Sequence, residues 1–504
     1  MLAKVRTATV LGLDGIGIDV EVDVRRGGCS LTIVGLPDKA VQESRDRVIT
    51  AIKNSAATFP TIRTTVNLAP ADIPKEGPSY DLPIAIGVLA ASKQIVIDTE
   101  NQVFIGELAL DGKVRRINGM IPIADYCRKN NITKVFVPYD NAYEASLIPG
   151  IKVYPVKKLC DLILHLSGEE LIEHFIPESK KNVEYKIPDS LNFKYVRGQQ
   201  QVRRAVEIAS AGGHNLLMNG TPGSGKTMIA RCIPSILPKM SIEESLEVSR
   251  IYSVAGLLSG KNPLIQRRPF RKPHHTISDA ALVGGGRYPK PGEISLSHRG
   301  VLFLDEFPEF PTKILETLRQ PLEDKVITIS RVSGTLTYPT NFMLVAAMNP
   351  CKCGWKGDSE RECLCSASDI QRYSRKISGP ILDRIDLKVF VPRVEYDKLQ
   401  TEELSESSEE ILKRVEAARD EQINRFGGTK ILTNSEMGAR DINTHCKLSV
   451  SCKNLMKKAS ERFLLSARSY FRIIKVSRTI ADLESSKEIK ESHIAEALQY
   501  RIVE

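Results

Sequence analysis

The octapeptide GTPGSGKT at residues 220–227 constrains the fold of this chain more than any other segment. It follows the apolar run NLLMN and precedes the helix-forming run MIARCIPSIL, so it matches G-x-x-x-x-G-K-T in a strand, loop and helix setting. Its glycines let backbone N–H groups turn around phosphate oxygens, Lys226 can reach the β- and γ-phosphates, and the Thr227 hydroxyl can ligate Mg²⁺. The residues that we expect to hold the nucleotide are Gly220, Thr221, Pro222, Gly223, Ser224, Gly225, Lys226 and Thr227.

Two acidic residues follow a second strongly apolar run. In GVLFLDE, residues 300–306, four apolar residues predict an interior strand with Asp305 at its carboxyl end. Asp305 can hold Mg²⁺ there, and Glu306 can polarise a water molecule as a general base. Taken alone, this pattern more often marks a strand that ends in a solvated turn. After a phosphate-binding loop it indicates a site for ATP and Mg²⁺.

Two further polar residues lie where a nucleotide site could use them. The run NFMLVAAMNP predicts another buried strand, and Asn349 at its end could orient the attacking water or form a turn before Pro350. In GPILDRIDL, Arg384 stands between Asp383 and Asp386, with which it could form a local ion pair. Offered instead to the γ-phosphate of a neighbouring subunit, such an arginine accelerates phosphoryl transfer by ~10³–10⁵.

The patterns along the 504 residues change several times, and the chain is too long for one hydrophobic core. Residues 1–165 mix strand-like runs with an apolar helix and predict one domain, and residues 166–194 are polar and aperiodic and predict a linker. Over residues 195–393, helical stretches alternate with short β runs, which is typical of a parallel sheet with crossover helices. Residues 394–504 carry helical periodicity and predict a lid. The expected fold class is α/β.

Four of the ten cysteines lie within residues 351–365. Cys351-x-Cys353 and Cys363-x-Cys365 are separated by nine residues, which is enough for a loop that returns four thiolates to one tetrahedral Zn²⁺. The usual spacing within a pair is C-x₂-C, so an Fe–S cluster or four unliganded thiols are alternatives. Because no open coordination position is implied, the zinc that we expect here is structural.

The charge balance favours a polyanionic partner. Lys and Arg outnumber Asp and Glu by 71 to 61, which gives a formal net charge of +10. No segment approaches the ~20 apolar residues that cross a bilayer, and the N-terminal run has no apolar core of a secretory signal. We therefore expect a cytoplasmic protein with no membrane partner, in which thiols stay reduced.

Six segments together resemble the AAA+ ATPases of the magnesium-chelatase-like, ComM type. They are VRGQQQVRRAVEIASAGGHNLLMNGTPGSGKT, RPFRKPHHTISDAALVGGG, HRGVLFLDEFPEF, AAMNPCKCG, KISGPILDRIDL and LSARSYFRIIKVSRTIADLE, and the resemblance covers nearly all of the chain. It implies that Asn349 is sensor 1, that Arg384 is an arginine finger acting in trans, and that Arg468 is a sensor-2 arginine from the lid. It also implies a homo-hexameric ring that drives DNA branch migration with ATP and Mg²⁺, on single-stranded or branched DNA during natural transformation.

In related ring motors, two insertions project hairpins into the central channel. Here GGGRYPKPGEISLSHRG and VITISRVSGTLTYP occupy those places, and the second predicts two β-branched strands joined by a turn near Arg331 to Gly334. The resemblance implies that Arg287, Lys290 and Arg331 contact DNA phosphates without reading sequence. Each of the three could equally be a solvated turn charge.

The first domain resembles the Lon-protease-type, S5-like domain. Ser79, in KEGPSYDLPIAIGVLAAS, occupies the place of the Lon nucleophile, but Ile121 occupies the place of the catalytic lysine. A serine needs an adjacent base, and an isoleucine cannot take a proton, so the Ser-Lys dyad is not intact. Ser79 is expected instead to cap a helix that starts near Asp81.

Two other functions share parts of this pattern. A magnesium-chelatase motor subunit, which remodels a protein partner for metal insertion, would have the same ATPase core. The fused Lon-like domain, the four-cysteine loop and the basic balance favour the DNA motor. A non-enzymatic DNA-binding scaffold conflicts with the intact acidic pair Asp305 and Glu306.

Overall fold

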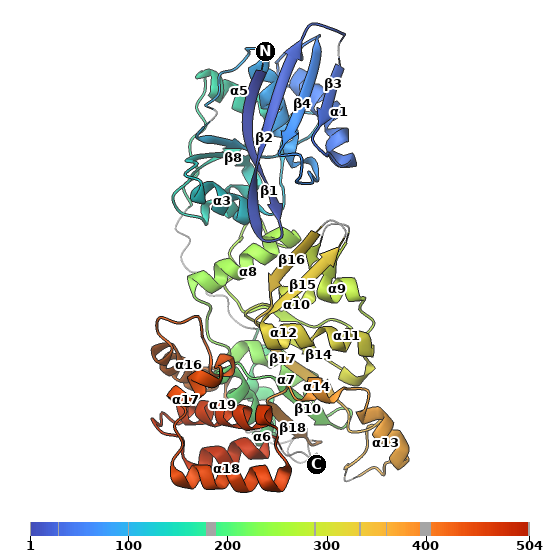
Figure 1. Ribbon diagram of the computed structural model, residues 1–504, viewed down its shortest axis with the longest axis vertical. Coiled ribbons are helices and arrows are strands. Elements are labelled where there is room, and N and C mark those ends of the chain that lie inside the picture. The colour runs from blue at the N-terminus through green and yellow to red at the C-terminus, as the bar shows by residue number, and fades with distance from the viewer. Residues whose placement is uncertain are drawn as a thin grey trace. The chain divides into compact units, whose positions relative to one another are not determined.

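The chain folds into two compact units in the computed structural model (Figure 1). Unit 1 comprises Met1–Val183 and Ile242–Ile265, and unit 2 comprises Glu184–Ser241 and Gln266–Glu504. The structure describes residues 2–28, 30–98, 100–177, 188–286, 289–331, 334–358, 360–393 and 405–501.

Unit 1 contains a seven-stranded sheet in the order β3-β4-β2-β1-β5-β8-β9. Strand β2 pairs antiparallel with β1 and β4, and the remaining pairs are parallel. Along β2 buried residues alternate with less buried ones, as in a strand with one face on a core. The strands are β1 (Leu2–Leu11), β2 (Asp14–Arg25), β3 (Ser30–Val34), β4 (Arg63–Ala69), β5 (Gln102–Phe104), β8 (Lys134–Pro138) and β9 (Lys152–Val156), beside a short hairpin of β6 (Glu107–Leu108) and β7 (Val114–Arg115).

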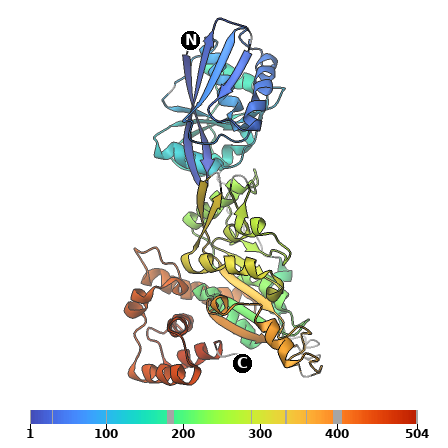
Figure 2. The same cartoon turned by 45° about the vertical axis from the view of Figure 1, so that its right-hand side comes forward.

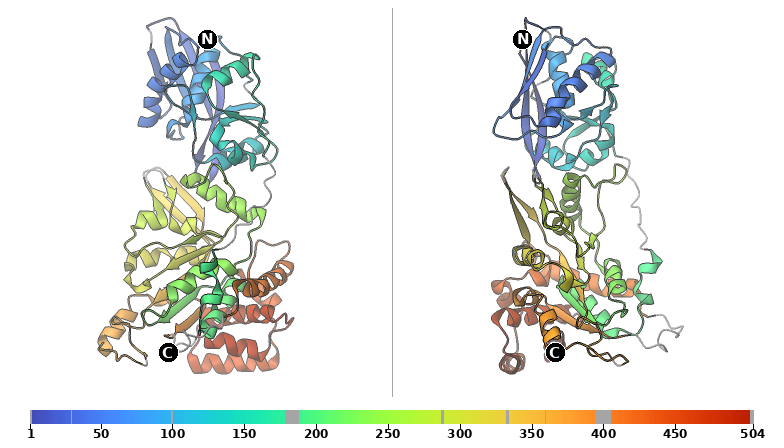
Figure 3. Two further views of the ribbon diagram at one scale, coloured as in Figure 1. Left: turned by 180° about the vertical axis from the view of Figure 1, so that it is seen from behind. Right: turned by 90° about the vertical axis from the view of Figure 1, so that its right-hand side faces the viewer.

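The helices of unit 1 gather on one side of its long strands (Figure 3, right). They are α1 (Lys39–Asn54), α2 (Asp81–Ala91), α3 (Met120–Lys129), α4 (Ala142–Ser146) and α5 (Leu159–Ser167). Helix α2 is apolar around its whole circumference and almost entirely buried, which is the pattern of a helix inside a core.

A helix from much later in the chain completes unit 1. Helix α8 (Ile242–Ala255) packs against α3. The hydroxyl of Ser253 donates to the buried carboxylate of Glu144 at 2.5 Å, and Arg250 forms a 3.1 Å ion pair with Asp125. The segment expected to form the ATPase core, residues 195–393, therefore contains a stretch, Ile242–Ile265, that belongs to unit 1.

Unit 2 is built on five parallel strands in the order β11-β14-β17-β10-β18. The strands are β10 (Leu216–Gly220), β11 (Phe270–Arg271), β14 (Val301–Leu304), β17 (Met343–Met348) and β18 (Leu387–Val391). All four residues of β14 are buried, and β17 is almost as apolar, as expected for strands covered on both faces. This architecture confirms the predicted α/β fold class, and it brings the carboxyl ends of these strands to one edge.

Helices and two small hairpins surround this sheet. The helices are α6 (Gln200–Gly212), α7 (Lys226–Cys232), α9 (Asp279–Val283), α10 (Glu293–Leu296), α11 (Thr312–Thr317), α12 (Arg319–Asp324), α13 (Ala367–Ser374) and α14 (Gly379–Leu382). The hairpins pair β12 (Gly284–Gly285) with β13 (Lys290–Pro291), and β15 (Val326–Arg331) with β16 (Gly334–Pro339).

The C-terminal helices form one body within unit 2, drawn in red in Figure 2. They are α16 (Ser408–Arg425), α17 (Ala439–His445), α18 (Val450–Phe463), α19 (Ala467–Leu483) and α20 (Glu491–Gln499). The buried carboxylate of Asp482 on α19 links that helix to α16, because it accepts from Arg425 of α16 at 2.8 Å as well as from Arg478 of α19 at 3.1 Å. Within the residues described, no helix is both long and apolar enough to cross a membrane.

Candidate active site

The loop between β10 and α7 has the backbone of a phosphate-binding loop. Gly223 and Gly225 have φ values of 78° and 86°, which a residue with a Cβ rarely adopts. At Gly220 a Cβ would lie 2.3 Å from the carbonyl oxygen of Val391, so only glycine lets β18 approach. Buried Gln199 secures the loop, since its amide donates to the carbonyl oxygen of Ser224 at 2.8 Å.

The ammonium group of Lys226 is surrounded by oxygen acceptors. It donates to the carbonyl oxygens of Gly220 and Thr221 at 2.6 and 2.8 Å, and it lies 3.3 Å from Oδ1 of Asn349. Burial lowers the pKa of Lys226 to about 8, although the nearby Asp305 opposes that shift. The contact with Asn349 brings the predicted sensor to the predicted phosphate-binding lysine.

Asp305 lies beside Thr227, as expected for two ligands of one Mg²⁺. The hydroxyl of Thr227 donates to Oδ2 of Asp305 at 2.8 Å. Burial alone would raise the pKa of Asp305, but hydrogen bonds from Lys272 and Thr227 outweigh it and hold this pKa below its ordinary value. The carboxylate is therefore ionised at neutral pH, as a magnesium ligand must be.

Glu306 follows in a left-handed backbone conformation, with φ 52° and ψ 45°. Its side chain is 60% exposed, so it can reach a water molecule at the edge of the sheet. Nδ1 of His275 lies 3.3 Å from one of its carboxylate oxygens. A general base here would act on water next to the phosphate-binding loop.

Arg384 and Arg468 share one partner. Both guanidinium groups bind the carboxylate of Glu323 on α12, Arg468 at 2.5 Å. The pKa of Glu323 is lowered, chiefly by its hydrogen bond from Arg384. The two aspartates next to Arg384 in the sequence pair with other arginines: Asp383 lies 3.7 Å from Arg501, and Asp386 lies 3.1 Å from Arg472.

The four cysteines after β17 form a cluster. The Sγ atom of Cys351 lies 3.3 Å from that of Cys353 and 3.6 Å from that of Cys363, and all four Sγ atoms, including that of Cys365, lie within 4.8 Å of one another. Four thiolates around a tetrahedral Zn²⁺ with ~2.3 Å bonds lie ~3.8 Å apart, so the cluster fits this ion. The N–H of Trp355 lowers the pKa of Cys353, whereas the pKa values of Cys363 and Cys365 are raised in the same cluster, so one thiol loses its proton more readily than its neighbours.

The cysteine loop touches the phosphate-binding loop. A Cβ on Gly354 would lie 2.5 Å from Cγ of Pro222. Gly354 also has a φ of 87°, which a residue with a side chain rarely adopts. Both the backbone conformation and the contact with Pro222 therefore favour glycine at this position. The same loop therefore begins next to Asn349, carries the sulfur cluster and lies against Pro222.

The Lon-like site in unit 1 differs from one sequence-based prediction. Ser79 does not cap α2: it lies in a 3₁₀ turn, Pro78–Tyr80, that runs directly into the helix. The first N–H groups of the helix find other acceptors, and that of Leu82 donates to the carbonyl oxygen of Gly106 at 3.0 Å. Ile121 is fully buried in an apolar cluster, so an alkyl group stands where the Lon lysine would be.

The hairpins predicted to face DNA lie side by side. Tyr338 of β16 donates to the carbonyl oxygen of Pro289 at 2.7 Å, and a Cβ on Gly285 would lie 3.4 Å from Nη2 of Arg331. Lys290 and Arg331 are both exposed. Arg287 lies outside the residues that the structure describes.

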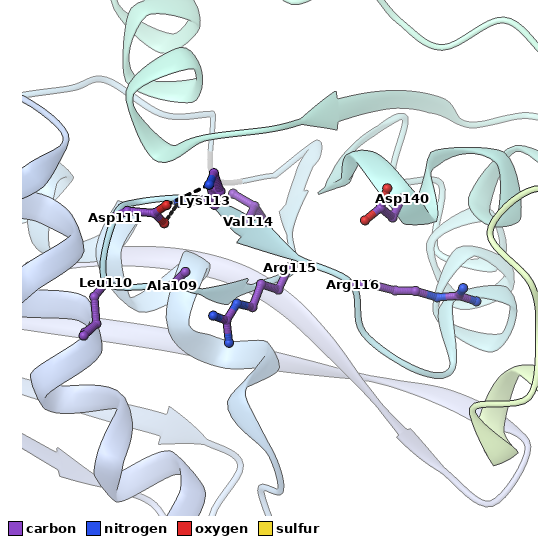
Figure 4. Close-up of a pocket in the computed structure, with 8 residues that line it drawn as sticks. All are labelled: Ala109, Leu110, Asp111, Lys113, Val114, Arg115, Arg116 and Asp140. Atoms are coloured by element: carbon purple, nitrogen blue, oxygen red, sulfur yellow. Dashed lines mark hydrogen bonds and ion pairs between the residues drawn. The ribbon is translucent and has the colours of Figure 1, made fainter.

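Figure 4 shows a pocket of unit 1 beside the β6–β7 hairpin. It is lined by Ala109, Leu110, Asp111, Lys113, Val114, Arg115, Arg116 and Asp140. Its three basic side chains are paired with carboxylates, Lys113 with Asp111 at 3.0 Å, Arg115 with Glu107 at 3.3 Å and Arg116 with Glu144 at 3.4 Å. Because these charges are balanced, the pocket offers no strong site for an anion.

Four residues of the site were not assigned a role from the sequence: Gln199, Lys272, His275 and Glu323. Gln199, Lys272 and His275 lie in segments that carry the family resemblance, but no local chemical pattern marks them. Their partners lie far away along the chain, so only the fold brings them together.

Comparison with known proteins identifies the family. The family described as magnesium chelatase, subunit ChlI, matches residues 192–399, and related descriptions match residues 20–141 and, for its C-terminal part, residues 405–501. The competence protein ComM of Haemophilus influenzae is 43% identical over 99% of this chain and 97% of its own length, and the protein YifB of Escherichia coli is 42% identical over 100% and 97%. Lon protease 2 of Bacillus subtilis is 29% identical over 161 residues, 29% of each chain, in keeping with a Lon-like N-terminal domain. Membership of an AAA+ family indicates an ATPase. The chain belongs to the ComM family of magnesium-chelatase-like proteins.

Proposed function

We propose that this protein is an ATP-driven, homo-hexameric DNA motor that catalyses branch migration on single-stranded or branched DNA. The observation that carries this proposal is the contact between the β12–β13 and β15–β16 hairpins, which presents Lys290 and Arg331 in the unit that holds the nucleotide loop. Exposed cations on paired hairpins suit a phosphate backbone, which a motor must follow irrespective of sequence.

The chemistry that drives the motor is ATP hydrolysis. Lys226 and the loop N–H groups would bind the phosphates, and Thr227 and Asp305 would hold Mg²⁺, which supplies charge stabilisation for the transferred phosphoryl group. Glu306 would take the proton of the attacking water, and Asn349 would orient that water. This assignment rests on the contacts of Lys226 with Asn349 and of Thr227 with Asp305.

The ring is proposed from the two arginines. Arg384 and Arg468 are held together by Glu323 and make no contact with Lys226 or Asp305 of their own chain among the contacts described above. An arginine stabilises a phosphoryl transition state only when it reaches the γ-phosphate. We therefore assign both to the nucleotide of a neighbouring subunit, which requires a head-to-tail interface, and a closed ring such as a hexamer gives every nucleotide such a neighbour.

The biological setting is proposed from the relative in Haemophilus influenzae that aligns over nearly its full length and is named a competence protein. On that basis the motor would extend the pairing of incoming single-stranded DNA with the chromosome during natural transformation. The formal net charge of +10 is compatible with a DNA partner.

The decisive experiment measures ATPase rate and strand exchange together. Purified protein is given ATP and Mg²⁺ with a labelled four-way junction, a forked duplex or no DNA. We expect DNA to raise the ATPase rate. We expect the four-way junction to be separated into two duplexes by branch migration only with hydrolysable ATP. An ATPase rate that is the same with and without every DNA, and no junction movement, would contradict the DNA motor.

A chelatase-type motor is the second candidate, because the matching family descriptions name magnesium chelatase. Such a subunit would use the same nucleotide site to remodel a protein partner for metal insertion. Stimulation of the ATPase by a porphyrin-chelatase partner, and not by DNA, would favour this function over the first.

We further propose that Cys351, Cys353, Cys363 and Cys365 bind a structural Zn²⁺. The proposal rests on four Sγ atoms that all lie within 4.8 Å of one another. Four sulfur ligands close the coordination sphere, so this ion would hold the loop and would take no part in hydrolysis.

A further inference from the structure

Both acidic residues at the end of β14 are bound by side chains from one short segment, which follows β11. Nζ of Lys272 lies 2.9 Å from Oδ2 of Asp305, and Nδ1 of His275 lies 3.3 Å from Oε2 of Glu306. Strands β11 and β14 are parallel neighbours, so their carboxyl ends lie at the same edge of the sheet. The segment Lys272–His275, which we call the acid-binding segment, therefore lies where hydrolysis would occur.

Lys272 binds the oxygen that a metal would use. Oδ2 of Asp305 accepts from Lys272 and also from the hydroxyl of Thr227, the other expected Mg²⁺ ligand. The ammonium group lies 5.3 Å from the centre of the Phe303 ring, and its side chain is only 33% exposed. An ammonium group and Mg²⁺ repel each other, so each weakens the binding of the other to one carboxylate oxygen. Lys272 is therefore a built-in competitor of the metal.

His275 restrains the proposed general base. Its ring lies 4.1 Å from that of His274 in a tilted arrangement and 6.4 Å from the Phe310 ring in an edge-on one, so packing on two sides limits its movement. His274 in turn bonds the hydroxyl of Thr276 at 2.9 Å. The contact engages one carboxylate oxygen, so Glu306 must leave His275 before it can present that oxygen to water.

The acid-binding segment leads directly to one of the hairpins assigned to DNA. Ser278 caps α9, and α9 leads into β12. A displacement of the β12–β13 hairpin can therefore reach His275 through one short helix.

We propose that Lys272 and His275 are positioning residues that hold Asp305 and Glu306 in an inactive arrangement, from which MgATP frees Asp305 and DNA at the β12–β13 hairpin frees Glu306. This deepens the proposed ATPase and DNA functions and rests on them. It makes the acid-binding segment the link between DNA occupancy and hydrolysis.

The first test concerns His275. Steady-state kcat and KM for ATP are measured with and without a forked duplex for wild type, His275→Ala, His275→Gln and, as a matched control, His445→Ala, whose ring lies on α17 against Phe426. We expect His275→Ala to raise the DNA-free kcat about two- to fivefold, the range of a half-exposed ion pair, with KM unchanged and DNA stimulation reduced by the same factor. His275→Gln, which can still bond Glu306, should stay close to wild type, as should His445→Ala. A DNA-free kcat of His275→Ala that is unchanged or lower overturns the restraint.

The second test concerns Lys272 and needs no hydrolysis. A fluorescent, non-hydrolysable ATP analogue is bound at increasing Mg²⁺ to wild type, Lys272→Met and the control Lys313→Met, whose lysine pairs with Asp279 and touches neither acid. Because the competitor is removed, Lys272→Met should reach half-maximal binding at about two- to fivefold lower Mg²⁺. An unchanged or higher midpoint overturns the role of Lys272.

The two arms separate this proposal from the function on which it rests. If DNA fails to stimulate the wild type, the DNA motor is contradicted and DNA cannot free Glu306, while the DNA-free comparison still decides whether His275 restrains it. If the wild type does not hydrolyse ATP, the ATPase and the restraint both fail, and the Mg²⁺ titration still decides the competition at Asp305.

Discussion

Arg384 and Arg468 bind the same carboxylate, that of Glu323, although one lies in the turn between α14 and β18 and the other in the first turn of α19. A shared anion holds two guanidinium groups close together despite their mutual repulsion. We therefore expect the two arginines to act at the same nucleotide.

The first prediction follows from that pair. Arg384→Ala and Arg468→Ala should each lower kcat, by ~10³ for Arg384, while each subunit still binds ATP. Mixing either variant with Lys226→Ala subunits should restore part of the activity, because some interfaces then pair an intact loop with intact arginines. The exposed Arg462 on α18 provides the control, since Arg462→Ala should behave as wild type. Mixtures that co-assemble without any recovery would exclude action in trans.

The second prediction separates binding from chemistry. Lys226→Ala should weaken ATP binding, since it removes the charge that faces the phosphates. Glu306→Gln should bind ATP normally but hydrolyse it at least ~10²-fold more slowly, because the amide cannot accept the proton of water. Equilibrium binding and single-turnover hydrolysis measure the two steps. Hydrolysis by Glu306→Gln at the wild-type rate would rule out Glu306 as the base.

The third prediction concerns pH. Burial lowers the pKa of Lys226 to about 8, and bound phosphates would raise it again. Below pH 8 the lysine is charged with or without ATP, so binding takes up no proton. Above pH 8 binding takes up one proton, and the affinity should fall by up to about tenfold per pH unit.

Calorimetry at pH 7 and pH 9, in buffers of different ionisation enthalpy, measures this proton uptake. Lys226→Arg provides the control, because its guanidinium does not titrate in this range and its binding should take up no proton from this side chain. Equal proton uptake by wild type and Lys226→Arg at pH 9 would contradict the assignment to Lys226.

The fourth prediction concerns the cysteine cluster. Protein purified without chelator should contain one zinc per chain by elemental analysis, and Cys363→Ser should lose most of it. Cys446→Ser removes a buried cysteine outside the cluster and should keep the metal. Because Gly354 lies against Pro222, loss of zinc should also raise the Kd for ATP. Well under one zinc per chain in the wild type would refute the metal site.

The fifth prediction concerns DNA. Lys290→Ala and Arg331→Ala should each lower DNA affinity similarly for all sequences, and each should reduce the slope of log K against log salt by about one. Branch migration should slow more than ATP hydrolysis, because the hairpin residues that contact DNA are not part of the site that hydrolyses ATP. Lys313→Ala offers a control of equal charge change. Unchanged junction movement by the triple variant of Arg287, Lys290 and Arg331 would remove the hairpins from the mechanism.

The sequence predicts the core of unit 2 well, because its signals are local. Apolar runs that end in Gly220, Asp305 and Asn349 become parallel strands, and parallel strands bring their carboxyl ends to one edge. The β15–β16 hairpin was predictable for the same reason, since β-branched runs flank a turn.

What sequence patterns miss are pairings between remote segments. Lys272 and His275 look like ordinary polar residues until β11 pairs with β14, and Glu323 gains its role only from two arginines that lie elsewhere in the chain. Ser79 shows the opposite error: a serine before a helix suggests a cap, but here Ser79 lies in a 3₁₀ turn, and the N–H of Leu82 donates to Gly106 instead.

Helix α8 has a consequence for anyone who wishes to dissect the protein. The helix packs against α3, its residues Val248 and Ile251 are fully buried, and Ser253 bonds Glu144. Deleting Met1–Val183 would thus expose the buried face of α8 within the remaining polypeptide, and exposed apolar surface of this kind promotes aggregation. A soluble ATPase fragment requires that residues 242–265 be replaced by a short polar linker, and the N-terminal half expressed alone would lack one of its own helices.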